Sequence, residues 1–279
     1  DREMVWTPPP SGKRGRQQQF SDAVILTCLT LKVLFGMPLR QTKGFVQSLL
    51  WLVGLDWAAP DFSTLCRRQQ TLNVSLPYRG STGPLNLLID STGIKAEGEG
   101  EWNARKHGGS KRRVWRKIHI GIDGETLKVR AVEDTGSNIG DAPMLPELLN
   151  QIPSDQDIGS VTADGAYDTR KCHEAIAARD AHAVVPPRKN AKPWKPTSTG
   201  AIARNDAVHA QRYLGRTLWR RWSGYHRRSR VETKMHCIKL LGQSLMARDF
   251  ERQVAEIQIR IAVLNRYTAL GIPVTEPVG

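Results

Sequence analysis

Short apolar segments alternate with helical segments between residues 85 and 185, and this order limits the folds that the chain can adopt. The expected strands are 85–90, 114–122, 127–132, 158–163 and 183–185, and the expected helices between the later strands are 142–151 and 169–179. Asp123-Gly124 is a hairpin signal between the second and third strands, and Asp168 is the expected cap of the 169–179 helix. Three adjacent strands followed by helix–strand units predict an α/β fold with a mixed sheet.

This order of elements is that of the ribonuclease H-like fold, in which three acidic residues from distant segments meet. One acid lies on the first strand and a second at the end of the fourth strand, beside it in the sheet. A third comes from a late helix. Asp90, Asp164 and Glu232 occupy these positions. Taken singly, the first two are equally consistent with ordinary turns at Asp90-Ser91-Thr92-Gly93 and Asp164-Gly165.

The segment after Gly224 carries a more specific pattern. At 100° per residue, a helix over about 225–241 places four polar residues within an arc of about 60°. These residues are Tyr225, Arg228, Glu232 and Lys239. An exposed Arg228–Glu232 pair is the simpler interpretation, but with the acid C-terminal to the base it has the weaker orientation for an exposed helical pair. A metal site explains the face better, with Glu232 as ligand and Arg228 and Lys239 holding phosphate oxygens.

Carboxylates suit a magnesium-dependent reaction on a phosphodiester. Mg²⁺ prefers oxygen ligands and is held through a few carboxylates together with substrate phosphates. Two such ions can activate an attacking oxygen and stabilise a leaving one. We therefore expect Asp90, Asp164 and Glu232 to be both metal ligands and catalytic residues, with Mg²⁺ as the cofactor and Mn²⁺ as a substitute.

The N-terminal part of the chain has a different character. Residues 1–19 are polar, proline-rich and basic, and predict an extended arm. Residues 20–80 predict three short helices, which resemble a helix-turn-helix DNA-binding region with Arg67 and Arg68 on the third helix. A plain helical cap on the larger domain is the alternative. We expect a catalytic domain over residues 81–270 and a tail over 271–279.

The charge of the chain indicates a polyanionic partner. Lys and Arg number 41 against 27 Asp and Glu, which gives a formal net charge of +14. A basic insertion is expected near residues 187–222, with Arg188, Lys189 and Trp194 as DNA contacts. Trp194, Trp219 and Trp222 could stack on a flipped base, although a place in the core or against the DNA backbone is the simpler interpretation. Lys117 and His119 share a strand face and are secondary candidates; a histidine satisfied within the sheet is the ordinary alternative.

Several other classes of protein are disfavoured. The four cysteines form no CxxC pair and the histidines have no metal-like spacing, which argues against a zinc site or a disulfide framework. No long uncharged apolar stretch predicts a membrane span, and no secretory leader is recognisable. We expect a cytoplasmic protein. The chain begins with Asp1, so we also expect its native start to be missing.

The sequence resembles the DDE transposases of bacterial insertion sequences over about residues 14–270. Tyr225-x2-Arg228-x3-Glu232-x6-Lys239 matches their Tyr-Arg-Glu-Lys signature. Four further segments look like the group named after insertion sequence number five: Ile89-Asp90-Ser91-Thr92-Gly93, Glu99-Gly100-Glu101-Trp102, Trp115-Arg116-Lys117-Ile118-His119 and Ala163-Asp164-Gly165-Ala166-Tyr167-Asp168.

The resemblance implies an acidic triad of Asp90, Asp164 and Glu232, with Tyr225, Arg228 and Lys239 positioning DNA. It also implies double-stranded DNA as partner, both as terminal inverted repeats and as target, a homodimer or higher oligomer when two ends are paired, and a bacterial, nucleoid-associated location. Two alternatives remain open. One is a non-catalytic DNA-binding regulator derived from a transposase, and the other is a structure-specific nuclease that hydrolyses DNA without joining ends.

Overall fold

The computed structural model describes residues 4–10, 12, 14, 15, 17–74, 76, 83–96 and 114–271. The chain forms two compact units. The first comprises residues 1–75, 96–114 and 240–263, and the second comprises residues 76–95, 115–239 and 264–279. Residues 240–263 thus group with the N-terminal helices, which a single boundary near residue 80 does not anticipate. The Glu99-Gly100-Glu101-Trp102 segment lies outside the described residues.

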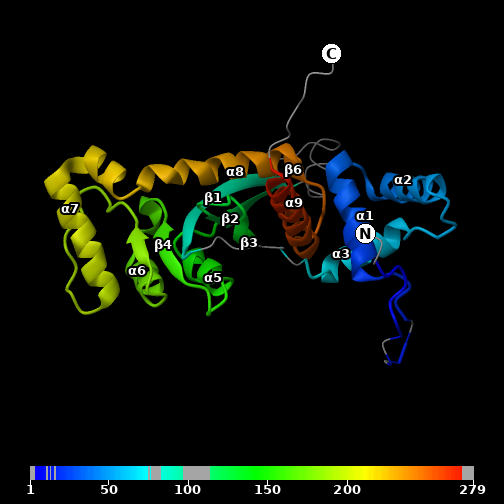
Figure 1. Ribbon diagram of the computed structural model, residues 1–279, viewed down its shortest axis with the longest axis horizontal. Coiled ribbons are helices and arrows are strands. Elements are labelled where there is room, and N and C mark those ends of the chain that lie inside the picture. The colour runs from blue at the N-terminus through cyan, green and yellow to red at the C-terminus, as the bar shows by residue number, and fades with distance from the viewer. Residues whose placement is uncertain are drawn as a thin grey trace, which may run out of the picture. The chain divides into compact units, whose positions relative to one another are not determined.

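Three helices near the N-terminus build the core of the first unit, as the sequence predicts. They are α1 (Asp22–Phe35), α2 (Leu39–Leu52) and α3 (Phe62–Thr71) (Figure 1). The Ser21 hydroxyl caps α1, and Gly36 ends it in the left-handed region at φ 61°, which glycine adopts without a steric penalty. Ile25, Leu29 and Leu65 are buried in one cluster with Ile259 of α9 (Phe250–Leu270). The short strand β6 (Ser244–Leu245) precedes α9.

No single helix in the described part of the chain is both long and apolar enough to cross a membrane. The helices α1 and α2 pass that test of length and composition only as a pair, and the pair is bent by 110° at its break.

The second unit is built on a mixed sheet with the strand order β3-β2-β1-β4-β5. The strands are β1 (Leu85–Ala96), β2 (Val114–Asp123), β3 (Val129–Gly136), β4 (Ile158–Thr162) and β5 (His182–Val184). The first strand continues six residues beyond its predicted end at Asp90, so Asp90 lies in mid-strand. This order and the helices on both faces of the sheet are consistent with a ribonuclease H-like domain.

The directions of the strands are those of a mixed sheet. β2 and β3 are antiparallel and joined at the Asp123-Gly124 hairpin, with Ile122 opposite Val129. A Cβ at Gly93 would lie 3.5 Å from Trp115, and one at Gly121 would lie 3.2 Å from Leu87, so β1 and β2 also run antiparallel. β4 is parallel to β1 and to β5. The sheet therefore changes from antiparallel to parallel at β1.

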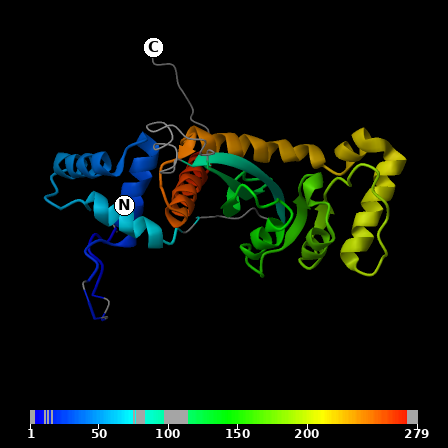
Figure 2. The same cartoon turned by 180° about the vertical axis from the view of Figure 1, so that it is seen from behind.

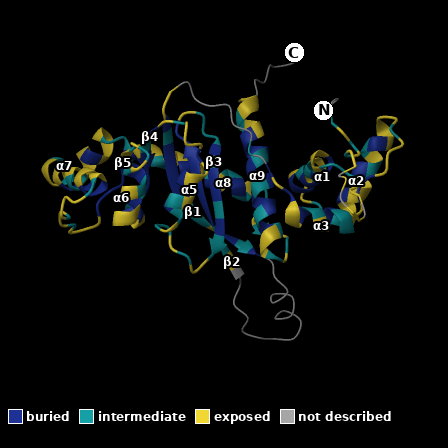
Figure 3. Ribbon diagram, turned by 90° about the horizontal axis from the view of Figure 1, so that it is seen from below, coloured by how far each residue is buried: buried dark blue, intermediate teal, exposed yellow. Residues whose placement is uncertain are grey.

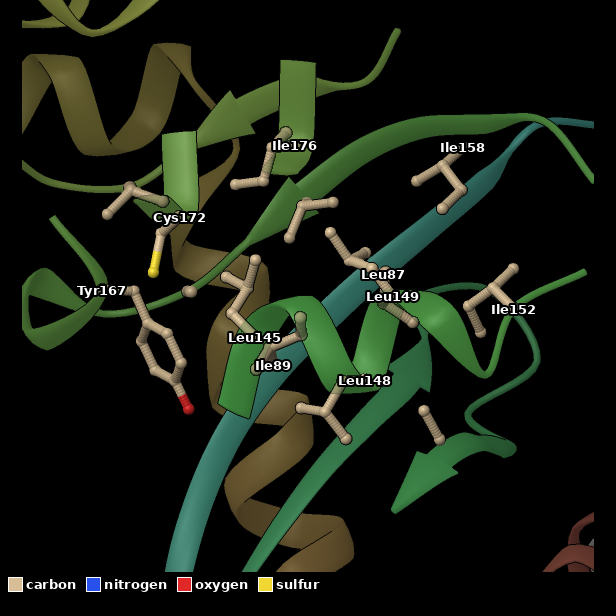
Figure 4. Close-up of a cluster of buried hydrophobic side chains, with 14 of the residues drawn as sticks. Leu87, Ile89, Leu145, Leu148, Leu149, Ile152, Ile158, Tyr167, Cys172 and Ile176 are labelled. Atoms are coloured by element: carbon tan, nitrogen blue, oxygen red, sulfur yellow. The ribbon is translucent and has the colours of Figure 1, made fainter. Parts of the chain in front are cut away.

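One face of the sheet is covered by α5 (Met144–Asn150) and α6 (Arg170–Ala177). Leu87 and Ile89 of β1 pack there against Leu145 and Leu148, as the close-up in Figure 4 shows. Figure 3 shows that most of the described strand residues are buried or half-buried. Because side chains alternate across a strand, Asp90 points to the opposite face from Leu87 and Ile89.

The remaining helices are α7 (Thr199–Trp222), a 3₁₀ turn η2 (Tyr225–Arg228) and α8 (Ser229–Leu240). Non-helical angles at Gly215 break α7 into two pieces. α8 lies on the opposite side of β1 from α5, as the view from behind confirms (Figure 2). On that side Arg230 Nη1 donates to the Gly124 carbonyl at 2.7 Å. The Gly124 amide in turn donates to the carbonyl of Asn86 in β1 at 2.7 Å, so the start of α8 is linked to the strand that carries Asp90.

One predicted cap is wrong. α6 is capped by the Thr169 hydroxyl, which accepts from the Cys172 amide, and Asp168 is not its cap. Asp168 is buried instead, beside His173 and Arg204. The Asp168 carboxylate does not cap the helix because it pairs with the buried guanidinium of Arg204.

Candidate active site

Two aspartates are brought together by the pairing of neighbouring parallel strands. Leu88 of β1 is paired with Thr162 of β4. Asp90 and Asp164 each lie two residues further along the chain, so they follow the same register and the same face. After β4 ends, Asp164 begins the 3₁₀ turn η1 (Gly165–Tyr167), and its Oδ1 accepts from the Ala166 amide at 2.8 Å. Its other oxygen, Oδ2, lies 3.9 Å from Arg228 Nη2.

The third acid comes from the first turn of α8. Glu232 has a side chain that is 57% exposed, and it lies four residues after Arg228. Arg228 Nη1 donates to Glu232 Oε1 at 2.8 Å. The pairing within this segment therefore orients the glutamate toward the guanidinium.

Arg228 joins the three acids. Its Nη2 donates to Asp90 Oδ2 at 2.6 Å and lies 3.9 Å from Asp164 Oδ2, while its Nη1 binds Glu232. The structure thus brings all three predicted acids around one cation. In sequence they are separated by 74 residues, from 90 to 164, and by 68 residues, from 164 to 232.

The electrostatics of this group reflect burial and pairing. Burial raises the pKa of Asp90, and repulsion from Asp164 adds to the rise, while Arg228 and the Ser91 amide oppose it. Burial by itself would lower the pKa of Arg228, but Asp90 and Asp164 raise it above its usual value. The Arg228 guanidinium is therefore the counter-ion that limits the rise in the pKa of Asp90.

The three carboxylates do not form a closed metal site in this structure. Within the described ranges, no three acidic, histidine or cysteine side chains close on a common point that could hold a metal ion. The carboxylates share Arg228 instead. Their chemistry nevertheless suits Mg²⁺, because all three offer hard oxygen donors. Tyr167 lies close enough for Asp141, Asp90 and Asp164 to raise its pKa, after burial as the main cause, and its buried hydroxyl has no hydrogen-bond partner among the described residues.

Tyr225 does not lie on the exposed polar face that the helical arc predicts. It is buried, packs on Trp219 with ring centroids 6.0 Å apart, and has Arg220 over its ring. The reason is local: residues 225–228 form a 3₁₀ turn, so the 100° spacing of an α-helix does not apply to them. Lys239, in the last turn of α8, is half-buried and has no hydrogen bond or ion pair with any described residue.

A fourth carboxylate, Asp141, lies beside the triad and has no signal in the sequence. It pairs with Lys117 Nζ at 2.8 Å and accepts a hydrogen bond from the Ser91 hydroxyl, next to Asp90. His119 is fully buried, with Nδ1 3.5 Å from Asp141 and Nε2 3.0 Å from Thr135 Oγ1. Burial lowers the pKa of His119 to about 4. His119 is therefore a neutral residue inside the sheet, with no surface for DNA.

The basic segment after β5 is anchored beside the site. The Arg188 guanidinium donates to the carbonyls of Gly165 and Ala166, directly after Asp164, and its backbone amide donates to Asp168 at 2.9 Å. Asp168 also binds Arg204 and His173, all three being buried. Lys189 is exposed. The sequence pattern identified the basic residues here but not the buried ion pair that holds them.

The three candidate stacking tryptophans differ in exposure. Trp194 has Arg204 and Arg170 over its ring, at 4.2 and 5.3 Å, and meets His173 edge-on. Trp219 is buried and only Trp222 is largely exposed. Trp194 and Trp219 therefore have structural partners.

The two arginines of α3, Arg67 and Arg68, have different surroundings. Arg68 donates to the Phe20 carbonyl at 2.9 Å and pairs with Asp22, which fixes the entry to α1. Arg67 is exposed on the same helix. Of the two predicted DNA contacts, Arg67 is exposed to solvent, whereas the Arg68 side chain holds the start of α1.

Comparison with known families agrees with this geometry. A family model described as a transposase DDE domain matches residues 81–266, which contain all three acids. A second model with the same description matches residues 1–99. The first match covers well over half of the chain. The chain therefore belongs to the DDE transposase family.

Proposed function

We propose that this protein is the transposase of an insertion sequence, in the group named after insertion sequence number five. It binds the terminal inverted repeats of its element, cleaves the element's ends and joins the 3′ hydroxyl to target DNA. The observation that carries the proposal is the meeting of Asp90, Asp164 and Glu232 around Arg228. A regulator that only binds DNA has no need for three convergent acids.

The three carboxylates would hold Mg²⁺, or Mn²⁺ as a substitute. When bound, a pair of such ions supplies positive charge to the attacking and leaving oxygens of the phosphodiester. Arg228 balances the carboxylates in the structure and, once their charge is otherwise neutralised, is placed to hold a phosphate oxygen. Water cleaves the phosphodiester, and the freed 3′ hydroxyl then attacks the target in line. No covalent protein–DNA intermediate is required, so the buried Tyr225 is not needed as a nucleophile.

DNA contacts are proposed on exposed and half-buried cations around the acids. Lys239 continues the face of α8, and Arg188 and Lys189 border Asp164. Lys117 sits beside Asp141, next to the Asp90 strand. The helices α1–α3, with Arg67 exposed, are the proposed end-recognition region. Pairing of two ends calls for a homodimer or higher oligomer, and the proposed setting is the bacterial cytoplasm, on the nucleoid.

The test is a strand-transfer assay with the element's own ends, Mg²⁺ and a target plasmid. The full chain should nick the ends and give joined products. Asp90→Ala, Asp164→Ala and Glu232→Ala should each abolish cleavage and leave end binding largely intact. A matched control is Glu251→Ala, an exposed acid on α9. Near-normal cleavage by Glu232→Ala would remove the assignment.

The same assay separates the two alternatives. A structure-specific nuclease would cleave the ends without joined products. A non-catalytic regulator would bind the ends and release neither nicked nor joined DNA with any divalent ion.

A further inference from the structure

A cavity of about 350 Å³ lies within the first unit, beside the start of α2 and the start of α9. Four cations line it: Lys32, Arg40, Arg248 and Arg252. The one acid in its lining is Glu256. The volume is at the lower end of the range typical of small-molecule sites, about 300–1,000 Å³. The wall is thus strongly cationic around a space for a small ligand.

The negative charge of Glu256 is already satisfied by other groups. Its oxygens accept from the Met246 and Ala247 amides at 3.1–3.2 Å, and Arg260 donates to it at 2.8 Å. Arg252 is likewise paired with Asp249. With Arg248 left aside, the four cations Lys32, Arg40, Arg252 and Arg260 face the two acids Glu256 and Asp249 among the described neighbours, so the surroundings of the cavity retain a positive excess.

Lys32 is the most buried of the four cations in the lining, and it forms an ion pair with Glu256. Its side chain is only 7% exposed, and its Nζ lies 3.9 Å from Glu256 Oε2, beyond hydrogen-bond distance. No described residue accepts a hydrogen bond from this ammonium. Burial lowers the pKa of Lys32, with Glu256 opposing and Arg260 assisting. An anion in the cavity would add to the charge compensation that Glu256 gives this ammonium from 3.9 Å.

The start of α2 adds a second source of positive potential. This helix of 14 residues begins after Pro38, which provides no side-chain cap, and its first turn contains no acid. Pro38, Leu39 and Arg40 all line the cavity. The free amides and dipole of a helix N-terminus favour anions, above all phosphate.

We infer that this cavity binds a phosphate monoester, either of a free mononucleotide or at the 5′ end of a DNA strand. The dianion would lie against the Lys32 ammonium and the first turn of α2, with Arg40 and Arg248 at the rim. A duplex backbone phosphate is excluded, because a double helix is too wide to carry its phosphate to a side chain as buried as Lys32. The site is separate from the acidic triad and does not depend on the proposed function.

The test is calorimetric titration of the full chain, without divalent ions. The probes are inorganic phosphate, dAMP, and two short single strands that differ only in a 5′ phosphate or a 5′ hydroxyl. Binding of dAMP supports a nucleotide site, and a preference for the 5′-phosphorylated strand supports a strand-end site. Lys32→Met and Arg40→Gln should each weaken binding about tenfold or more, the loss expected for one charge-assisted contact.

Lys43→Gln is the matched control, because Lys43 is exposed on α2 and does not line the cavity. Circular dichroism checks the fold of Lys32→Met; if that variant does not fold, the rim variant Arg40→Gln still decides. The inference would be overturned if none of the probes showed saturable binding. It would also be overturned if Arg40→Gln and Lys43→Gln bound the probes with equal affinity. Neither result would affect the strand-transfer assay.

Discussion

Arg228 sets the charge balance of the acidic group at the scale of single residues. Its guanidinium contacts Asp90 and Glu232 directly, and Asp164 lies at 3.9 Å. Without it, carboxylates that lie close together would repel one another and raise each other's pKa. The structure therefore describes a state in which an internal cation balances the triad.

Replacing Arg228 with Gln should destabilise the protein when divalent ions are absent. We expect a loss of roughly 1–3 kcal/mol, the usual effect of removing a partly buried charged hydrogen-bond partner. Added Mg²⁺ should recover more stability in Arg228→Gln than in the parent protein. Urea unfolding in chelator and in Mg²⁺ measures both effects. Arg227→Gln, an exposed neighbour on the same turn, is the control, and equal stability of the two variants in chelator would contradict this role.

Asp134 gives a pH-dependent prediction. Burial raises its pKa from 3.8 to about 7, with Arg116 and the Thr135 amide opposing the rise. A raised folded-state pKa means that the protonated form stabilises the fold at low pH. This contribution is lost as the pH rises from about 4 through about 7.

Asp134→Asn should abolish that decline. The free energy of unfolding of the parent protein should fall by up to about 3 kcal/mol more than that of Asp134→Asn between pH 5 and pH 8, by the linkage of pKa to stability. Urea unfolding at both pH values checks it, with the exposed Glu147→Gln as control. Parallel pH profiles for Asp134→Asn and the parent protein would show that Asp134 does not titrate in this range.

At the scale of elements, the succession of strands and helices could be predicted because apolar alternation and the hairpin signal depend on local sequence. The expectation that Asp90 and Asp164 lie side by side came from the ribonuclease H-like fold, and the pairing of β1 with β4 agrees with it. Tyr225 was misplaced because a 3₁₀ turn replaced the first turn of the expected helix. Asp168 and Asp141 could not be assigned, because their partners Arg204 and Lys117 are distant in sequence and only the fold brings them together.

The loop between β5 and α7 should depend on the buried pair of Asp168 and Arg204. Arg204 also donates to the Lys192 carbonyl at 2.6 Å and lies over Trp194, so it links α7 to the basic loop. Arg204→Met should cost about 3–5 kcal/mol, because it leaves a buried carboxylate without its cation. Hydrogen exchange over residues 186–198 should become much faster. The exposed Arg216→Met on the same helix is the control, and unchanged exchange in Arg204→Met would refute the link.

At the scale of the whole molecule, the net charge of +14 predicts strong dependence of DNA binding on salt. If six or more phosphates are contacted, affinity for duplex DNA should fall by about 10³-fold or more between 50 and 200 mM salt. Fluorescence anisotropy with labelled end DNA measures the slope. Lys239→Gln should make the slope of log affinity against log salt concentration shallower by about one, as expected for the loss of one phosphate contact. A flat salt dependence would contradict a binding mode based on these cations.

The central claim is that three acids from distant parts of the chain share divalent cations. Fe²⁺ in place of Mg²⁺, with ascorbate and peroxide, cuts a polypeptide backbone near the bound ion. The account predicts cuts close to Asp90, Asp164 and Glu232, which excess Mg²⁺ suppresses and which Glu232→Gln weakens at all three places. Cuts at only one of these segments, or cuts that Mg²⁺ does not suppress, would contradict it.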